Sequence, residues 1–256
     1  MILVPLVQFA VCFLILAWLL KKKPGERFSK KAVAKFLLFG ALSAVACMIL
    51  AMSVLPIDRD SFFGMNPILS GFLTALITAA LLEEILKYIF FRLAIRKHGE
   101  VVCWLDAIIA AIAVGIGFTL LEDLTYLFDG AGSILRALLP GHLLFQAIMG
   151  YYYGKARVTK QARYDVLSLA VPVLAHTLFD MFLAGMMSIV GSPEAAIRMS
   201  EEEIRALPYA NYMVPMLACA IAVFVITFVA LIVTAIKISR WSKRGEKREP
   251  LTAENT

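Results

Sequence analysis

Long runs of residues that lack Asp, Glu, Lys and Arg constrain this chain more than any other feature of its sequence. A helix of about 20 apolar residues crosses the roughly 30 Å hydrocarbon core of a bilayer. The charge-free runs are 1–20, 36–57, 61–82, 137–154 and 206–236. Two further apolar segments, 101–127 and 166–190, carry internal charges. We therefore expect an all-α, polytopic membrane protein with about seven transmembrane helices.

The composition supports this interpretation. Hydrophobic residues make up 61% of the 256 residues and charged residues 17%, against roughly 25% charged in soluble proteins. A water-soluble globular domain is thereby excluded. We expect one membrane-embedded helical domain over 1–238, in which residues 61–190 carry the motifs described below, followed by a polar cytoplasmic tail at 239–256.

Basic residues alternate between connections, which predicts the orientation. The connections at 21–35, 92–97 and 155–163 and the end of the chain at 237–248 are rich in Lys and Arg, whereas 58–60, 129–136 and 194–205 are poor in them. Cytoplasmic loops carry such an excess, so the N-terminus is expected outside and the C-terminus in the cytoplasm. The net charge of +6 then reflects contact with anionic lipid rather than binding of nucleic acid.

Ionisable residues inside the apolar segments are the main functional signal, because a charge within the membrane costs several kcal/mol unless it is paired or faces water. Glu83, Glu84 and Lys87 form the first cluster, with Glu83 and Lys87 on one helix face. Two carboxylates beside one ammonium leave a negative charge. We expect a partner from another helix, a metal ion or a shared proton.

Three further segments supply candidate partners. Glu122 is followed by Asp123 in one, His142 lies in the next, and the pair His176 and Asp180 has i,i+4 spacing in the third. Four helices that each present an acid or a histidine are typical of a site in the core of a helical bundle. We therefore expect these side chains to converge.

Each residue also has a purely structural interpretation. Glu84 and Lys87 could form an ion pair near the cytoplasmic end of their helix. Glu122 and Asp123 could end a helix at the outer surface, and His142, just after Pro140, could lie at the interface. His176 is hard to explain in this way, because about 16 Å of helix separates it from Asp165 and places it near mid-membrane.

The ordered motifs resemble those of the PrsW-type intramembrane proteases, which are distant relatives of the CAAX-prenyl endopeptidase (bacteriocin-processing) superfamily. The resemblance covers half of the chain, and the four motifs together are specific. These motifs are Glu83-Glu84-x-x-Lys87, Phe118-x-x-x-Glu122, His142 with Gly150 eight residues on, and His176-x-x-x-Asp180. The resemblance implies cleavage of single-pass membrane substrates such as anti-sigma factors, in a bacterial plasma membrane. It also implies an active site of Glu83, Glu84, Glu122, His142 and His176, supported by Lys87, Asp123 and Asp180.

The chemistry of hydrolysis suits these residue types. Glu83, partly desolvated beside a second carboxylate, is a candidate general base. His142, His176 and Glu122 are the predicted metal ligands, with Zn²⁺ as the expected cofactor, because an open catalytic zinc site has three N or O ligands and water. Asp180 could instead be a ligand or orient His176. A metal-free mechanism that uses Glu and His stays open.

Two other functions compete with proteolysis. A proton-coupled transporter or channel would use the buried Glu and His residues as a relay. Against it, the sequence has no paired interrupted segments, and an odd number of helices divides into unequal halves. A non-catalytic scaffold does not explain four helices with buried ionisable groups.

Helical rise places Glu122 and His142 closer to the outer boundary than Glu83, so we expect a site toward the extracytoplasmic side.

Overall fold

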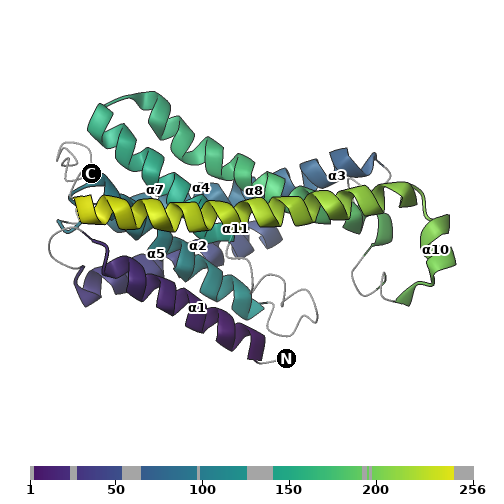
Figure 1. Ribbon diagram of the computed structural model, residues 1–256, viewed down its shortest axis with the longest axis horizontal. Coiled ribbons are helices and arrows are strands. Elements are labelled where there is room, and N and C mark those ends of the chain that lie inside the picture. Colours follow the sequence, from purple (N-terminus) through teal and green to yellow (C-terminus); the bar gives the residue numbers. More distant parts are fainter. Residues whose placement is uncertain are drawn as a thin grey trace.

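The computed structural model describes residues 3–23, 28–53, 65–96, 99–125, 141–191, 195 and 198–244, and this part of the chain is helical without β-strands. Figure 1 shows the long helix α11 running the length of the bundle, with α10 at the end where α3 begins. In chain order the elements are α1 (Leu3–Leu20), α2 (Lys30–Ser53), α3 (Pro67–Thr74), the π-helix η2 (Ala75–Ala80), α4 (Leu81–Ile95), α5 (Trp104–Thr125), α7 (Gly141–Thr159), α8 (Ala162–Val190), α10 (Glu201–Ala206), the 3-10 helix η3 (Ala210–Tyr212) and α11 (Met213–Arg244).

Each of the seven predicted segments overlaps a long helix. Among the residues that the structure describes, five helical stretches are long and apolar enough to cross a membrane: Lys30–Met52, Pro67–Ile95, Trp104–Thr125, Ala162–Val190 and Ala210–Lys243. The fold class, an all-α multi-pass membrane protein, is therefore confirmed. The number of crossings, the sides of the termini and the domain limits stay predictions. Several predicted ends and residues 245–256 of the predicted tail lie outside the described residues.

The third helical stretch extends further than its charge-free run. That run ends at residue 82, whereas α3, η2 and α4 form continuous helix to Ile95. Its charged residues are paired within the helix: the Lys87 ammonium lies 2.9 Å from a carboxylate oxygen of Glu83 and of Glu84, which offsets part of their negative charge. The charged cluster therefore lies inside a transmembrane helix rather than at its end.

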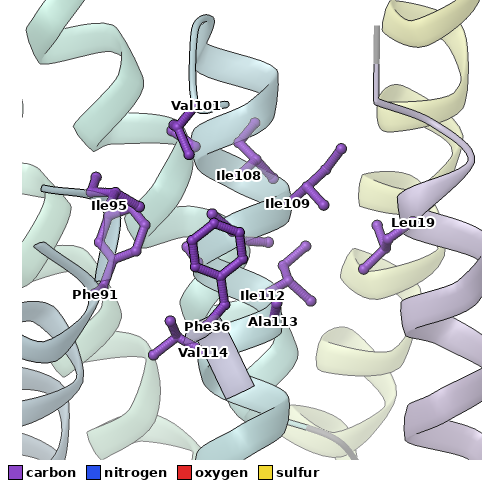
Figure 2. Packing of buried hydrophobic residues seen from close by; sticks show 14 of the residues in the cluster. Leu19, Phe36, Phe91, Ile95, Val101, Ile108, Ile109, Ile112, Ala113 and Val114 are labelled. Atoms are coloured by element: carbon purple, nitrogen blue, oxygen red, sulfur yellow. The ribbon is translucent and has the colours of Figure 1, made fainter. Parts of the chain in front are cut away.

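Helix α5 is the centre of the bundle. Within its most apolar window 89% of the residues are buried, against 17–33% in the other four candidate spans. A helix that is apolar on all sides can be enclosed by others, and α5 packs mainly against α2 and α7. Figure 2 shows Leu19, Phe36 and Phe91, from three other helices, around residues 108–114 of α5.

Glycines allow α2 and α5 to approach closely. A Cβ atom added at Gly40 would lie 2.0 Å from the carbonyl oxygen of Val114, and one added at Gly117 would lie 2.1 Å from that of Leu37. Within lipid, small residues at helix interfaces allow the close van der Waals packing that holds helices together. This contact fixes the position of the α5 end that carries Glu122.

Aromatic side chains gather near the basic connections. The rings of Trp104, Tyr151 and Trp241, from α5, α7 and α11, have centroids 4.8–6.3 Å apart. The Lys155 ammonium lies 4.4 Å from the centroid of the Tyr164 ring. Trp and Tyr are enriched where a membrane meets water. The start of α5 and the ends of α7 and α11 therefore share one end of the bundle, which the loop charges predict to be cytoplasmic.

Candidate active site

Four helices bring the predicted site residues together. Helix α4 carries Glu83, Glu84 and Lys87 in its first two turns, and η2 precedes it directly. A π-helical turn within an α-helix is frequent at functional sites. The other members lie on α5, α7 and α8, and are Glu122, His142, His176 and Asp180. Predicted residues that are far apart in the sequence thus meet inside the bundle.

The ammonium of Lys87 lies at the centre of the cluster. Its Nζ atom is 2.9 Å from Oε2 of Glu83, 2.9 Å from Oε1 of Glu84 and 3.0 Å from Nδ1 of His142. The same atom lies 3.7 Å from the centroid of the Phe118 ring, a cation–π contact. Lys87 is fully buried. Its charge is therefore held by protein groups and not by bulk water.

Glu84 connects α4 to the two histidine helices. Its Oε1 atom accepts from Lys87 and lies 3.0 Å from Nδ1 of His176. Its Oε2 atom accepts a 3.0 Å hydrogen bond from the amide of Gln146. Glu84 is 0% exposed, whereas Glu83 is 9% exposed. Of the two adjacent carboxylates, Glu83 is the one that water can reach.

Each imidazole is oriented by a carboxylate on its Nε2 atom, the ring nitrogen that faces away from Lys87 and Glu84. Nε2 of His142 lies 2.8 Å from Oε2 of Glu122, and Nε2 of His176 lies 3.1 Å from Oδ2 of Asp180. Lysine can only donate, so Nδ1 of His142 accepts from Lys87, and the ring proton on Nε2 is donated to Glu122. Histidines that bind metals are commonly held in this way by a carboxylate on the other ring nitrogen.

The donor set fits a divalent cation. One ligand atom each from Glu83, Glu84, His142 and His176 all lie within 4.8 Å of one another. Ligand atoms around tetrahedral zinc are separated by roughly 3.3 Å, as follows from bonds of about 2 Å. A neutral His176 ring, bonded through Nε2–H to Asp180, would leave its Nδ1 lone pair facing Glu84, so this contact requires a proton or a cation. This grouping contains Glu84, which was not among the predicted ligands, and does not contain Glu122, which was.

The net charge of the site also favours a bound cation. Four carboxylates, those of Glu83, Glu84, Glu122 and Asp180, surround one ammonium and two imidazoles. With neutral imidazoles, the cluster has an excess of negative charge in a buried setting. A bound cation relieves such an excess, because buried charges are stable only when compensated.

The remaining predicted residue, Asp123, takes another direction. It follows Glu122 and is therefore turned by about 100° around α5. Asp123 is 6% exposed. Glu122 lies three residues before Thr125, the last described residue of α5, so its structural interpretation as a helix-end residue stays a prediction.

Two site residues were not assigned a role from the sequence. Gln146 lies one helical turn after His142 and donates to Glu84. Phe145 stacks on the His176 ring, with centroids 4.9 Å apart and an interplanar angle of 21°. A buried amide at i+4 from a histidine was a usable signal for Gln146. An aromatic residue in an apolar segment gives no comparable signal.

Comparisons with known proteins match the chain across this site. Residues 29–200 match the model of the "PrsW family intramembrane metalloprotease" family. A Protease PrsW of Halalkalibacterium halodurans is 35% identical over 170 residues, which cover 64% of this chain and 75% of that protein. Relatives of the same name from Oceanobacillus iheyensis and Bacillus subtilis are 32% and 34% identical over 162 and 124 residues, covering 61% and 45% of this chain and 72% and 56% of theirs. No solved structure matches the chain.

Proposed function

Because the chain belongs to the PrsW family of intramembrane proteases, a family of multi-pass bacterial membrane proteins, we propose that it hydrolyses peptide bonds of membrane-anchored proteins at the Glu/His cluster. The observation that carries this proposal is the meeting of two imidazoles with two carboxylates inside the bundle, each imidazole held from behind by a further acid. These are residue types that can activate water and stabilise the developing charge in a site enclosed by apolar helices.

We assign the roles from burial and contacts. Glu84, His142 and His176 would hold a divalent cation, with Zn²⁺ the expected ion. Glu122 and Asp180 would orient the two rings. When bound, zinc polarises the scissile carbonyl and makes water more acidic.

The mechanism assigns the proton transfers to Glu83. This carboxylate is the more exposed of the pair on α4, so it can accept the proton of an attacking water and later donate it to the leaving amine nitrogen. Its hydrogen bond from Lys87 fixes the orientation of one carboxylate oxygen. The other oxygen is then the one that acts on water.

The position of the cluster supports cleavage toward the extracytoplasmic side. Glu122 lies three residues before Thr125, the last described residue of α5, and His142 is the second described residue of α7. Both positions are far along these helices from the aromatic end of the bundle, where α5 starts and α7 ends. Glu83 and His176 lie in the middle of their longer helices. A membrane-anchored substrate of the anti-sigma-factor type, cut near its outer end, fits this depth.

An apolar hollow supports access from the lipid. It has a volume of about 710 Å³ and lies between the α3–η2–α4 helix and α8. Its lining includes Leu81, two residues before Glu83, and Thr177, the residue after His176. Leu174, also in the lining, is 55% exposed. A substrate helix seated there would bring its backbone next to the turns that carry the site.

Filling this hollow is expected to impair cleavage of membrane substrates selectively. Leu174→Trp should raise KM for a single-pass substrate about tenfold, because the indole occupies the space proposed for the substrate helix. The measurement is cleavage of that substrate in vesicles. Leu217→Trp, on α11 at 45% exposure, is the matched control and should retain the wild-type KM. An unchanged KM in Leu174→Trp would exclude this route.

Metal removal is expected to stop cleavage. Purified protein treated with EDTA should lose hydrolysis of a single-pass substrate and regain it when zinc is added, because the water nucleophile depends on the cation. Metal content is measured in parallel on protein purified without a metal-affinity tag. Full activity in metal-free protein would favour the Glu/His mechanism without metal.

The same preparation tests the alternative of a proton-coupled transporter. The family relationship does not favour that alternative. Proton uptake into proteoliposomes without peptide cleavage would support it and contradict the proposed protease function.

A further inference from the structure

The ammonium of Lys87 occupies the place where the candidate ligand atoms converge. Its three N–H groups are matched by three acceptors, one each from Glu83, Glu84 and His142. Three of the four residues that could hold a metal ion are therefore bonded to this one nitrogen. The described part of the cluster thus already contains a cation of its own.

We propose that Lys87 is a built-in cation that keeps the site assembled without metal and that a divalent ion must displace on binding. This inference rests on the proposed metal-dependent function. It assigns Lys87 a positioning role: the residue holds the ligand side chains in place and sets the affinity for the metal.

Competition follows from shared lone pairs. A metal bound to Nδ1 of His142 would use the lone pair that now accepts from Lys87, whose Nζ lies 3.0 Å away. The Oε1 atom of Glu84 likewise accepts from Lys87 at 2.9 Å and faces His176 at 3.0 Å. An imidazole nitrogen has one lone pair in the ring plane, so it cannot serve both cations at once.

Displacement is feasible for a lysine. Its ammonium sits on a flexible stem of four carbons, so rotation about the side-chain bonds can withdraw the charge while the helix stays in place. The Phe118 ring, 3.7 Å from Nζ, lies beside the ammonium and offers a cation–π contact that does not use any metal ligand. The ring can therefore keep contact with the ammonium as it moves.

The proposal predicts opposite effects on metal affinity and on metal-free stability. Removal of the ammonium relieves the competition, so zinc should bind more tightly. The same change leaves the buried carboxylates uncompensated when no metal is present, so the metal-free protein should melt at a lower temperature. A lysine with only a local structural role would lower stability without tightening zinc binding.

The test is zinc affinity measured by competition with a chromophoric chelator, on full-length protein in detergent. Lys87→Met should bind zinc at least about tenfold more tightly than wild type, because the ion no longer competes with a cation for the ligand lone pairs. Lys87→Arg, which retains a cation, should not bind more tightly than wild type. Lys155→Met, which removes a half-buried cation of α7 beside Tyr164, is the matched control and should have wild-type affinity.

If Lys87→Met alone does not fold, a double variant with balanced charge still tests the proposal. Glu83→Gln removes one negative charge, so the double variant Glu83→Gln with Lys87→Met has the same net charge as wild type. Relative to Glu83→Gln alone, the double variant should bind zinc at least about tenfold more tightly and show a larger rise in Tm on zinc addition.

The outcomes separate this inference from the proposed function. Zinc affinity that is unchanged or weaker after removal of the ammonium, in both backgrounds, overturns the role of Lys87 and leaves the metal-dependent protease intact. Absence of zinc binding in wild type and in every variant overturns the metal-dependent part of the proposed function and this inference together.

Discussion

Glu83→Gln is expected to reduce hydrolysis of a single-pass substrate by about a thousandfold or more while zinc content stays at the wild-type level. Gln has nearly the same shape, and its amide oxygen can still accept from Lys87, but it cannot take a proton from water. Glu83 is also the carboxylate of the pair with access to solvent. The measurement combines a cleavage assay with metal analysis of the same preparation.

The control for this variant is an exposed carboxylate of the same protein. Glu202, in the first turn of α10, is exposed, so Glu202→Gln should retain wild-type cleavage. Comparable elution and thermal unfolding of both variants in detergent would show that Glu83→Gln has folded. Wild-type turnover by Glu83→Gln would exclude this residue as the general base.

His176→Ala is expected to lose both cleavage and bound zinc. The imidazole lies 3.0 Å from Glu84 and 3.1 Å from Asp180, so it is the link between α8 and the cluster on α4. Without it, the proposed zinc site retains only two ligands, Glu84 and His142, which is fewer than a catalytic zinc site has. Hydrolysis should fall to the level of the uncatalysed reaction.

A matched substitution on the same helix separates this effect from a general loss of structure. The hydroxyl of Ser188 donates to the carbonyl oxygen of Gly185, within α8 and more than three turns after His176. Ser188→Ala should therefore retain both zinc and activity. Retained zinc in His176→Ala together with lost cleavage would assign His176 a role in catalysis other than metal binding.

Together the two variants separate the roles on α4 and α8. Replacing the proposed base, Glu83, should stop cleavage without loss of zinc, whereas replacing the proposed ligand, His176, should eliminate both cleavage and bound zinc. Equal loss of zinc in both variants would make Glu83 a ligand as well, which the spacing of the four candidate ligand atoms permits.

Depth arithmetic along single helices could not predict how these residues meet. From the sequence, Glu122 and His142 lie nearer one boundary of the membrane than Glu83 and His176. In the structure, His142, the second described residue of α7, lies 3.0 Å from Nζ of Lys87 in the second turn of α4. The centroid of its ring lies 5.2 Å from that of His176 in the middle of α8. Helix ends and helix centres converge because the helices differ in length and in their offset along the bundle.

The contacts between individual atoms could not be predicted from the sequence either. The sequence pairs Lys87 with Glu83 through i,i+4 spacing, but its contact with His142 depends on the packing of α5 against both α7 and α4. Glu122 was a predicted ligand of the expected metal. Its carboxylate instead lies against the nitrogen of His142 that faces away from the cluster. Only the relative rotation of α5 and α7 determines which imidazole nitrogen faces inward.

The sequence by itself determined that this is a helical membrane protein and which residues carry its ionisable groups. It could do so because the energy of transfer into lipid depends on local composition, and because helical spacing places side chains on faces. Only the tertiary structure decided which carboxylate orients which imidazole, and that a lysine lies among the candidate ligands. Those contacts depend on the mutual rotation and offset of four helices, set by close packing between segments distant in the chain, such as Gly40 and Gly117 at the α2–α5 crossing.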